Sequence, residues 1–200
     1  SDSNGGHSFA DGFATLQKAA NAAAAGDIIY VATGTYAPFS TNNKDVRVWA
    51  ARGAKPVVDG GGTKQCVSAG SNGQTVSRFR GLTLRNGLTT GYGGGASGGT
   101  FEDCVIENCD SSSGGFAVGG TFVRCKIGNT VNNGGYFCNY VRLINCVVSG
   151  VRKLTSDGAP NSANICNSKI INTTFADNFF TIWWINPTEV YNSILNISNN

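Results

Sequence analysis

The chain has 200 residues, enough for one domain or one long repeat array, and only 14% of them are charged. It contains 28 glycines and no methionine, a profile typical of an extracellular β-rich protein. The net charge of +3 is small and the basic residues are scattered singly, which argues against nucleic-acid binding. No apolar run approaches the ~18 residues of a membrane span.

The first residues predict a helix that caps a longer structure. The chain opens SDSNGGHS, which we interpret as the start of a processed or excised secreted segment. We expect a helix from about Asp11 to Ala25, with Asp11 or Ser8 as its N-cap and Gly26 at its end. Four apolar residues fall at helical spacing within residues 8–27: Phe9, Phe13, Leu16 and Ala20.

Residues 28–62 are predicted to form the first coils of a repeat array. IIYV (28–31) would be the first rung, and VRVWAARGAKPVVDGGG (46–62) the next strands and turn. The open end of such an array exposes core and unpaired backbone, so it needs a cover. The preceding helix is therefore interpreted as that cover.

From residue 63 to 200 one pattern recurs at spacings of 22, 21, 21, 22 and 25 residues. Regular self-similarity at this period predicts a solenoid. The six copies are FRGLTLRN (79–86), FEDCVIEN (101–108), FVRCKIGN (122–129), LINCVVSG (143–150), ICNSKIIN (165–172) and VYNSILNI (190–197).

Two positions of the pattern are spaced by two residues, which is the alternation of a strand with both side chains on one face. The first set is Leu82, Cys104, Cys125, Cys146, Ser168 and Ser193. The second set is Leu84, Ile106, Ile127, Val148, Ile170 and Leu195. Each copy is therefore predicted to be one coil of a β-solenoid in which like residues stack.

Two further positions predict tight turns, because Gly, Asn and Asp adopt a left-handed backbone at low cost. The first ladder is Gly81, Asp103, Arg124, Asn145, Asn167 and Asn192. The second is Asn86, Asn108, Asn129, Gly150 and Asn172.

These motifs resemble the right-handed parallel β-helix of the pectate-lyase-like superfamily. GGGASGGTFEDCVIEN and GGFAVGGTFVRCKIGN are also similar to the repeats of bacterial polymorphic outer-membrane and surface β-helix proteins. The resemblance implies an all-β fold: a single-stranded right-handed parallel β-helix of about 21–22 residues per coil with an N-terminal capping α-helix. Residues 1–200 would form one domain, with regular coils over 63–200.

The three cysteines of the pattern, Cys104, Cys125 and Cys146, fall on successive rungs. Parallel strands lie about 4.8 Å apart, whereas a disulfide prefers Cβ atoms about 3.8 Å apart. We predict a buried ladder of free thiols, with a bridge between one pair as the alternative. Cys138 matches Ala96 and Ala117 and is predicted to fill the core, and the spacing does not indicate a zinc site.

The resemblance implies an active groove along one strand of each coil, with Ca²⁺-binding acids and an Arg or Lys base. The corresponding strands contain no charged residue: GGGAS (93–97), GGFAV (114–118), GYFCN (135–139) and IWWIN (182–186). This argues against catalysis on that face. The remaining catalytic candidates are Arg152, Lys153 and Asp157 in one loop, where a base beside an acid could act in β-elimination or simply face solvent.

The same strands carry aromatic residues that could stack on sugar rings. Phe116, Phe137 and Trp184 are predicted to share one repeat position, and Tyr136 and Trp183 the neighbouring one. One set should point outward and bind ligand. The alternative is that the larger side chains pack inward or cover the end of the solenoid.

We therefore expect a non-catalytic module of a secreted or cell-surface bacterial protein that serves adhesion or binds a polysaccharide or host glycan. The alternatives are a polysaccharide lyase or glycoside hydrolase, which alone would need Ca²⁺, and a structural unit that stacks end to end. No other cofactor or metal is expected. Because the last strand has no cap, we expect the chain to continue or another subunit to cover it.

Overall fold

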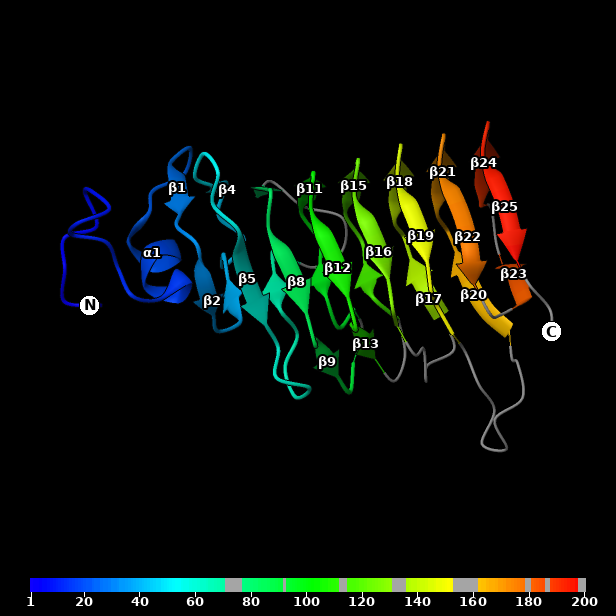
Figure 1. The fold of residues 1–200 in the computed structure, drawn as a ribbon, viewed down its shortest axis with the longest axis horizontal. Coiled ribbons are helices and arrows are strands. Elements are labelled where there is room, and N and C mark those ends of the chain that lie inside the picture. The colour runs from blue at the N-terminus through cyan, green and yellow to red at the C-terminus, as the bar shows by residue number, and fades with distance from the viewer. Residues whose placement is uncertain are drawn as a thin grey trace.

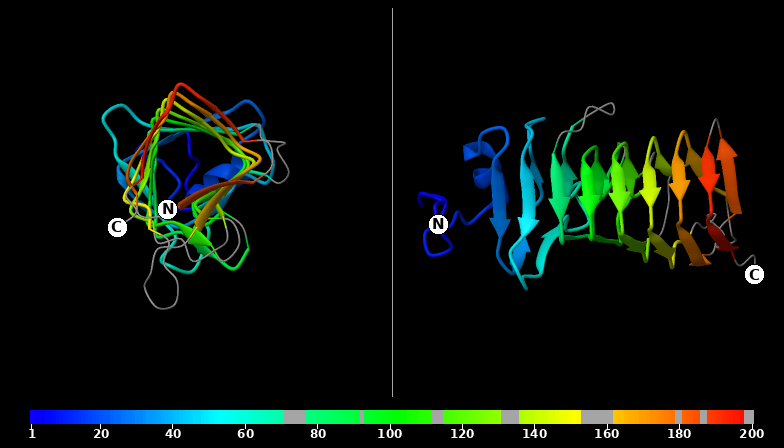
Figure 2. Two further views of the ribbon diagram at one scale, coloured as in Figure 1. Left: turned by 90° about the vertical axis from the view of Figure 1, so that its right-hand side faces the viewer. Right: turned by 90° about the horizontal axis from the view of Figure 1, so that it is seen from above.

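In a computed structural model, the chain forms a parallel β-solenoid with one short helix at its N-terminal end (Figure 1). The structure describes residues 1–70, 77–91, 93–111, 115–130, 136–152, 162–178, 181–185 and 188–197. Three parallel sheets, here called A, B and C, form the sides of the solenoid, and Figure 2 shows the three sides in the view along its axis. The predicted parallel β-helix is confirmed.

Sheet A contains one strand from each coil. In sheet order its strands are β1 (Ile28–Val31), β4 (Arg47–Ala50), β7 (Arg78–Arg80), β11 (Thr100–Glu102), β15 (Thr121–Val123), β18 (Arg142–Ile144), β21 (Lys169–Ile171) and β24 (Glu189–Tyr191).

Sheet B follows sheet A in each coil after a tight turn. Its strands are β2 (Gly34–Tyr36), β5 (Pro56–Asp59), β8 (Thr83–Arg85), β12 (Val105–Glu107), β16 (Lys126–Gly128), β19 (Val147–Ser149), β22 (Thr174–Asn178) and β25 (Ile194–Ile197).

Sheet C closes each coil. Its strands are β3 (Phe39–Ser40), β6 (Val67–Ser68), β10 (Ala96–Ser97), β14 (Ala117–Val118), β17 (Tyr136–Asn139), β20 (Ser162–Cys166) and β23 (Thr181–Ile185). A fourth, two-stranded sheet joins β9 (Leu88–Thr89) to β13 (Asp110–Ser111) in the loops between B and C.

The core lies inside the solenoid and is built from stacked like residues. The ring of Phe101 stacks on Phe79 at 4.5 Å and on Phe122 at 5.0 Å between ring centroids. All three rings are fully buried. The stack follows from the register, because Phe79, Phe101 and Phe122 are Cα partners on adjacent strands of sheet A.

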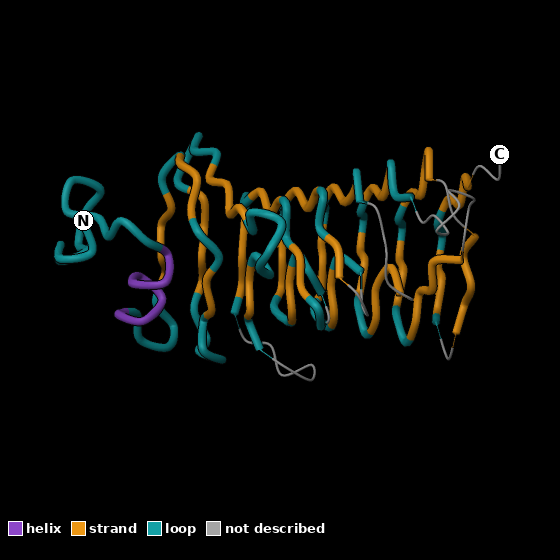
Figure 3. Tube along the Cα trace, turned by 90° about the horizontal axis from the view of Figure 1, so that it is seen from below, coloured by secondary structure: helices purple, strands orange, loops and turns teal. Residues whose placement is uncertain are grey.

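Helix α1 (Leu16–Ala22) lies at the N-terminal end of the solenoid, where Figure 3 shows it beside the first coil. It is shorter than predicted and begins later. Its N-cap is Thr15, whose hydroxyl accepts a hydrogen bond from the Lys18 amide, and not Ser8 or Asp11. Leu16 and Ala20 pack into the core, whereas Phe9 precedes the helix and is exposed.

The cysteine column lies on the inward side of the turn between sheets A and B. Each thiol donates to the carbonyl two residues before it: Cys104 to Glu102, Cys125 to Val123 and Cys146 to Ile144, at 3.3–3.4 Å. All seven cysteines are buried, and none is bonded to another. The register also pairs Cys138 with Ala117, and Ala117 with Ala96, which confirms that they share one column.

The register contradicts the predicted fifth repeat. Ile170, not Ile165, is the Cα partner of Leu143 in sheet A, whereas Ile165 pairs with Cys138 in sheet C. The coil that starts at Leu143 therefore contains 27 residues instead of 22. ICNSKIIN resembles the repeat because the turn from C to A also uses a left-handed Asn, Asn167, followed by a small buried residue.

The ladders change accordingly. Asn172 takes the place predicted for Asn167 in the first ladder, next to Asn145, and Asn192 donates a hydrogen bond to its side chain at 2.9 Å. Asp177 takes the place predicted for Asn172 in the second ladder, after Gly150. Thr173, not Ser168, follows Cys146, whose amide donates to the Thr173 hydroxyl. The left-handed residues with φ between 44° and 53° are Asn86, Asp103, Asn108, Arg124, Asn129, Asn145, Asn167, Asn172, Asp177 and Asn192.

Candidate functional site

The outer face of sheet A carries an excess of positive charge. Alternation along the strands places five cationic side chains and two carboxylates on this face: Arg47, Arg78, Arg80, Arg142, Lys169, Glu102 and Glu189. On sheet B, in contrast, Asp59 and Arg85 are paired at 2.7 Å on adjacent rungs. No charged side chain lies on the outer face of sheet C among its described residues.

The register arranges this face as two outward columns. The first, at the start of each strand, is Ile28, Arg47, Arg78, Thr100, Thr121, Arg142, Lys169 and Glu189. The second, two residues later, is Tyr30, Trp49, Arg80, Glu102, Val123, Ile144, Ile171 and Tyr191.

The first three rungs combine aromatic rings with guanidinium groups in an arrangement we call the N-terminal cluster, formed by Tyr30, Arg47, Trp49, Arg78 and Arg80. The Tyr30 and Trp49 rings meet edge to face with their centroids 6.3 Å apart. The guanidinium carbon of Arg80 lies 4.3 Å from the Trp49 ring centroid, a close cation–π contact. Tyr30 is 56% exposed, and Trp49 is half-buried.

Arg47 and Arg78 lie directly beside this row, on adjacent rungs of the first column. Within the described part of the chain, neither they nor Arg80 form an ion pair with a carboxylate. Like charges on neighbouring strands repel each other. The cluster therefore presents cationic groups that the protein itself does not neutralise.

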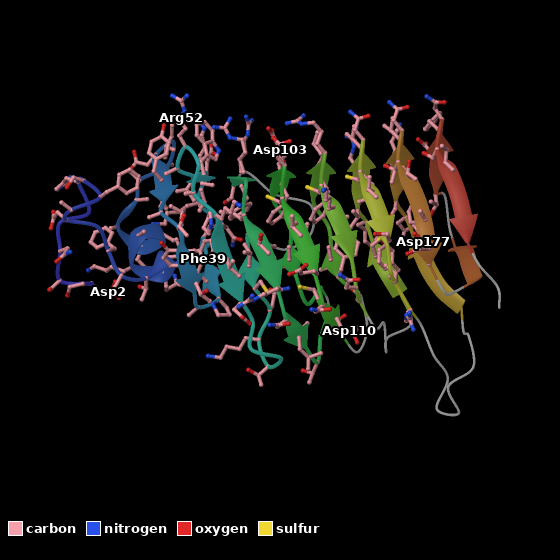
Figure 4. All side chains as sticks on the ribbon, viewed as in Figure 1. Asp2, Phe39, Arg52, Asp103, Asp110 and Asp177 are labelled. Atoms are coloured by element: carbon pink, nitrogen blue, oxygen red, sulfur yellow. The ribbon has the colours of Figure 1, made fainter. Side chains whose placement is uncertain are left out.

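An ion-paired group ends the cluster on the next rungs. Arg124 lies 2.7 Å from Asp103 and 3.6 Å from Glu102. The hydrogen bonds that Arg124 donates lower the pKa of Asp103 and raise the pKa of Arg124, so both groups stay charged and paired. Figure 4 shows Asp103 at the edge of the solenoid where the sheet A strands end, on the same side as Arg52.

Two of the aromatic residues predicted to bind ligand are in the core. Phe116 and Phe137 are fully buried and contact each other, with ring centroids 4.9 Å apart. They cannot stack on a sugar, and this prediction is wrong. The reason is the pleat: small residues of sheet C, such as Ser97 and Val118, face outward.

The other predicted ligand residues lie on strands of the same sheet. Trp184 pairs with Ile165, and Ile165 with Cys138, so Trp184 does not share a position with Phe137 as predicted. Trp183 is aligned with Tyr136 through Asn164. The side chains of Tyr136, Trp183 and Trp184 lie outside the described residues.

The catalytic candidates are not brought together by the described structure. The Arg152 amide bonds to the Thr130 carbonyl at 2.8 Å, and its side chain is exposed. Lys153 and Asp157 lie outside the described residues. Among the residues that are described, no three His, Cys, Asp or Glu side chains converge as a metal site.

A cavity of about 730 Å³ lies at the N-terminal end of the solenoid, between residues 5–16, α1 and the edge strands β1 and β2. Its lining is largely apolar, with Phe13, Leu16 and Ile29 among the contacts. It is separate from the outward face of sheet A apart from Ile28 and Tyr30.

The residues of the N-terminal cluster were missed by sequence reasoning. Arg47 and Arg78 are 31 positions apart, and nothing in the local sequence shows that they are neighbours. The available signal was alternation within RVWA and RFR, in which the arginines and Trp49 flank a buried residue.

No protein-family model and no curated protein matches this sequence. Among solved structures, the chain is similar to a rhamnogalacturonan lyase, with 15% identity and a TM-score of 0.46. The match covers 95% of this chain and 60% of that chain, so the chain spans about 60% of the length of its neighbour. In the described part of the chain, no helix has the length and apolar character to cross a membrane.

Proposed function

We propose that this chain is a non-catalytic module of a secreted or cell-surface protein that binds acidic polysaccharide through the N-terminal cluster on sheet A. The observation that carries the proposal is the row Tyr30–Trp49–Arg80 with Arg47 and Arg78 beside it. The proposal moves the sugar-binding surface from sheet C, where sequence analysis expected it, to sheet A.

The chemistry of the cluster matches a sugar acid. The apolar face of a pyranose ring stacks on an aromatic ring, and the partly exposed Tyr30 and Trp49 offer such faces. A carboxylate accepts two parallel hydrogen bonds from one guanidinium group. Arg47 and Arg78 stand one rung apart, so an anion between them would relieve their repulsion.

The shape of the surface supports a polymer as the ligand. The cluster lies on the open face of a sheet and not in an enclosed pocket, so it does not limit the length of the bound chain. Adhesion through a host or cell-surface glycan would use the same contacts. We propose that binding needs no cofactor, so that chelating Ca²⁺ leaves it unchanged.

The test is binding of polygalacturonate, a uronate polymer, and of neutral xylan by isothermal titration calorimetry. We expect the wild-type protein to prefer the uronate polymer. The pair Arg47→Gln and Arg78→Gln should weaken binding by about tenfold or more, because two charge-assisted contacts are lost. Trp49→Ala should weaken it through the lost stacking surface.

The matched control is the pair Lys64→Gln and Lys126→Gln, which removes the same charge from exposed positions away from sheet A. Equal weakening by both pairs would show that only net charge matters and would refute the proposed site. Growth of ultraviolet absorbance from unsaturated products during the titration would instead support a Ca²⁺-dependent lyase, and end-to-end association would appear as an increase of size with protein concentration.

A further inference from the structure

A second group of aromatic and basic side chains lies on the same face, nearer the C-terminal end. Tyr140, in the turn that leads into sheet A, is 63% exposed, and Arg142 follows it on β18. On the next two rungs, Lys169 lies 5.0 Å from the ring centroid of Tyr191, which is half exposed. We call Tyr140, Arg142, Lys169 and Tyr191 the C-terminal cluster.

The backbone of Tyr140 is left-handed, with φ of 56°. The corresponding turn residues on neighbouring coils are Gly98, Gly119 and Asn167, with φ of 68°, 65° and 49°. Glycine and asparagine adopt this conformation readily, whereas a bulky residue is strained in it. Because most of the Tyr140 side chain faces solvent, core packing does not account for the strained residue.

The two clusters are joined by a continuous uncharged path. Between Arg78 and Arg142, the first outward column contains only Thr100 and Thr121. The nearest carboxylates, Glu102 and Asp103, lie outside that column and are paired with Arg124. From β4 to β18 there are four rung steps, which correspond to about 19 Å at the usual spacing of parallel strands.

We infer that the C-terminal cluster is a second binding site for the same acidic polysaccharide, and that one glycan chain lies along the solenoid axis and contacts both clusters. The inference rests on the proposed function of the N-terminal cluster. The Arg142 side chain forms no ion pair with a described residue and can bind a sugar carboxylate, and the Tyr140 ring offers a stacking face. Lys169, which is paired with Glu189 at 2.8 Å, contributes less charge.

Two sites on one rigid face predict a dependence on ligand length. A chain that spans about 19 Å can bind both clusters at once, so its second contact is intramolecular and raises the affinity. A uronate disaccharide reaches only one cluster. We therefore expect a long oligogalacturonide to bind about tenfold or more tightly than the disaccharide, beyond the statistical gain of a longer chain.

The experiment compares the galacturonate disaccharide with an oligogalacturonide several times longer, on wild-type protein and on a Tyr140→Gly, Arg142→Gln variant. The variant should lose the gain from length while the disaccharide still binds to the N-terminal cluster. Glycine occupies the same turn in the coils that contain Gly98 and Gly119, so the variant keeps a permitted backbone, and circular dichroism should show an unchanged fold. Lys126→Gln is the control for a lost surface charge.

The outcomes separate the inference from the proposed function. A gain from length that persists in the variant refutes the second site and leaves the proposed function standing. If the disaccharide and the long chain both bind wild type and the Arg47→Gln, Arg78→Gln variant equally, the proposed function fails. Loss of the gain in the Tyr140→Gly, Arg142→Gln variant alone, with the Lys126→Gln control unchanged, supports the inference.

Discussion

Substitution of two buried cysteines by serine should have opposite consequences, because their thiols have different partners. Cys125 donates from its Sγ to the carbonyl of Val123 at 3.4 Å, and its column continues as Thr173 and Ser193. These two hydroxyls each donate to the carbonyl two residues earlier, at 3.0 and 2.8 Å. The site is thus already built to accept a hydroxyl group.

Cys138 is fully buried in sheet C, and its thiol has only the Ser168 hydroxyl nearby, at 3.9 Å. That distance is too long for a hydrogen bond between two oxygens. Its column neighbours Ala96 and Ala117 show that a methyl group fits there.

The magnitudes follow from these contacts. Cys125→Ser keeps a hydrogen bond and nearly the same volume, so we expect it to cost under about 1 kcal/mol, less than or equal to Cys125→Ala, which leaves a methyl-sized cavity worth about 1 kcal/mol. Cys138→Ser buries an unsatisfied hydroxyl and should cost about 1–3 kcal/mol more than Cys138→Ala.

Urea unfolding followed by circular dichroism measures the four free energies of unfolding. The ratio of interest is serine to alanine at each site, which cancels most effects of the lost sulfur. If Cys125→Ser is less stable than Cys125→Ala by more than about 1 kcal/mol, the hydrogen bond inferred at this column does not stabilise the fold.

Three further predictions concern the turns, the thiols and the N-terminal segment. Arg124→Asn should change the stability by less than about 0.5 kcal/mol, because relief of a left-handed residue offsets an exposed ion pair; a loss above about 1.5 kcal/mol in urea unfolding would contradict this. A thiol reagent at pH 8 should react with all seven cysteines only after unfolding, since burial shields them and raises the pKa of Cys138 to about 12; a disulfide would lower the count by two. Asp2 accepts hydrogen bonds from Thr15 and Ala14, and its pKa is lowered chiefly by the Thr15 hydroxyl. A lowered folded pKa means that the contact contributes stability above the unfolded value near 3.8 and loses it as the pH falls through the folded value, so hydrogen exchange of the Thr15 amide should accelerate below pH 3.8 in wild type and be fast at all pH values in Asp2→Ala.

The fold could be predicted because each coil repeats the same inward residues. Phe79, Phe101 and Phe122 are separated by nearly constant spacings and become neighbours in sheet A. The prediction failed where a longer loop follows Val151, because the next two corners of the solenoid have similar sequences. Ile165-Cys166-Asn167-Ser168 and Ile170-Ile171-Asn172-Thr173 both consist of a buried residue, a left-handed Asn and a small hydrogen-bonding residue.

The candidate site could not be predicted, for a different physical reason. A charge pattern in the sequence shows neighbours along one strand, whereas the contacts that form the clusters run between coils. Trp49 and Arg80 are 31 positions apart and meet only because β4 pairs with β7 in one register. With the register predicted for ICNSKIIN, Lys169 would have been placed outside sheet A altogether.

The charges on the three faces show why sheet A is the surface that needs an external partner. On sheet B, a cation and a carboxylate occupy adjacent rungs, so Arg85 and Asp59 satisfy each other. On sheet A, Arg47 and Arg78 occupy adjacent rungs with the same sign, an arrangement that opposes folding by roughly 1 kcal/mol for unit charges 4 Å apart in water and less at greater separation. The aromatic pair Tyr30–Trp49 beside them leaves apolar area exposed instead of burying it. Neither feature stabilises the solenoid by itself, and a bound chain of sugar acids would stabilise both: its carboxylates would separate the arginines, and its ring faces would cover the aromatic side chains.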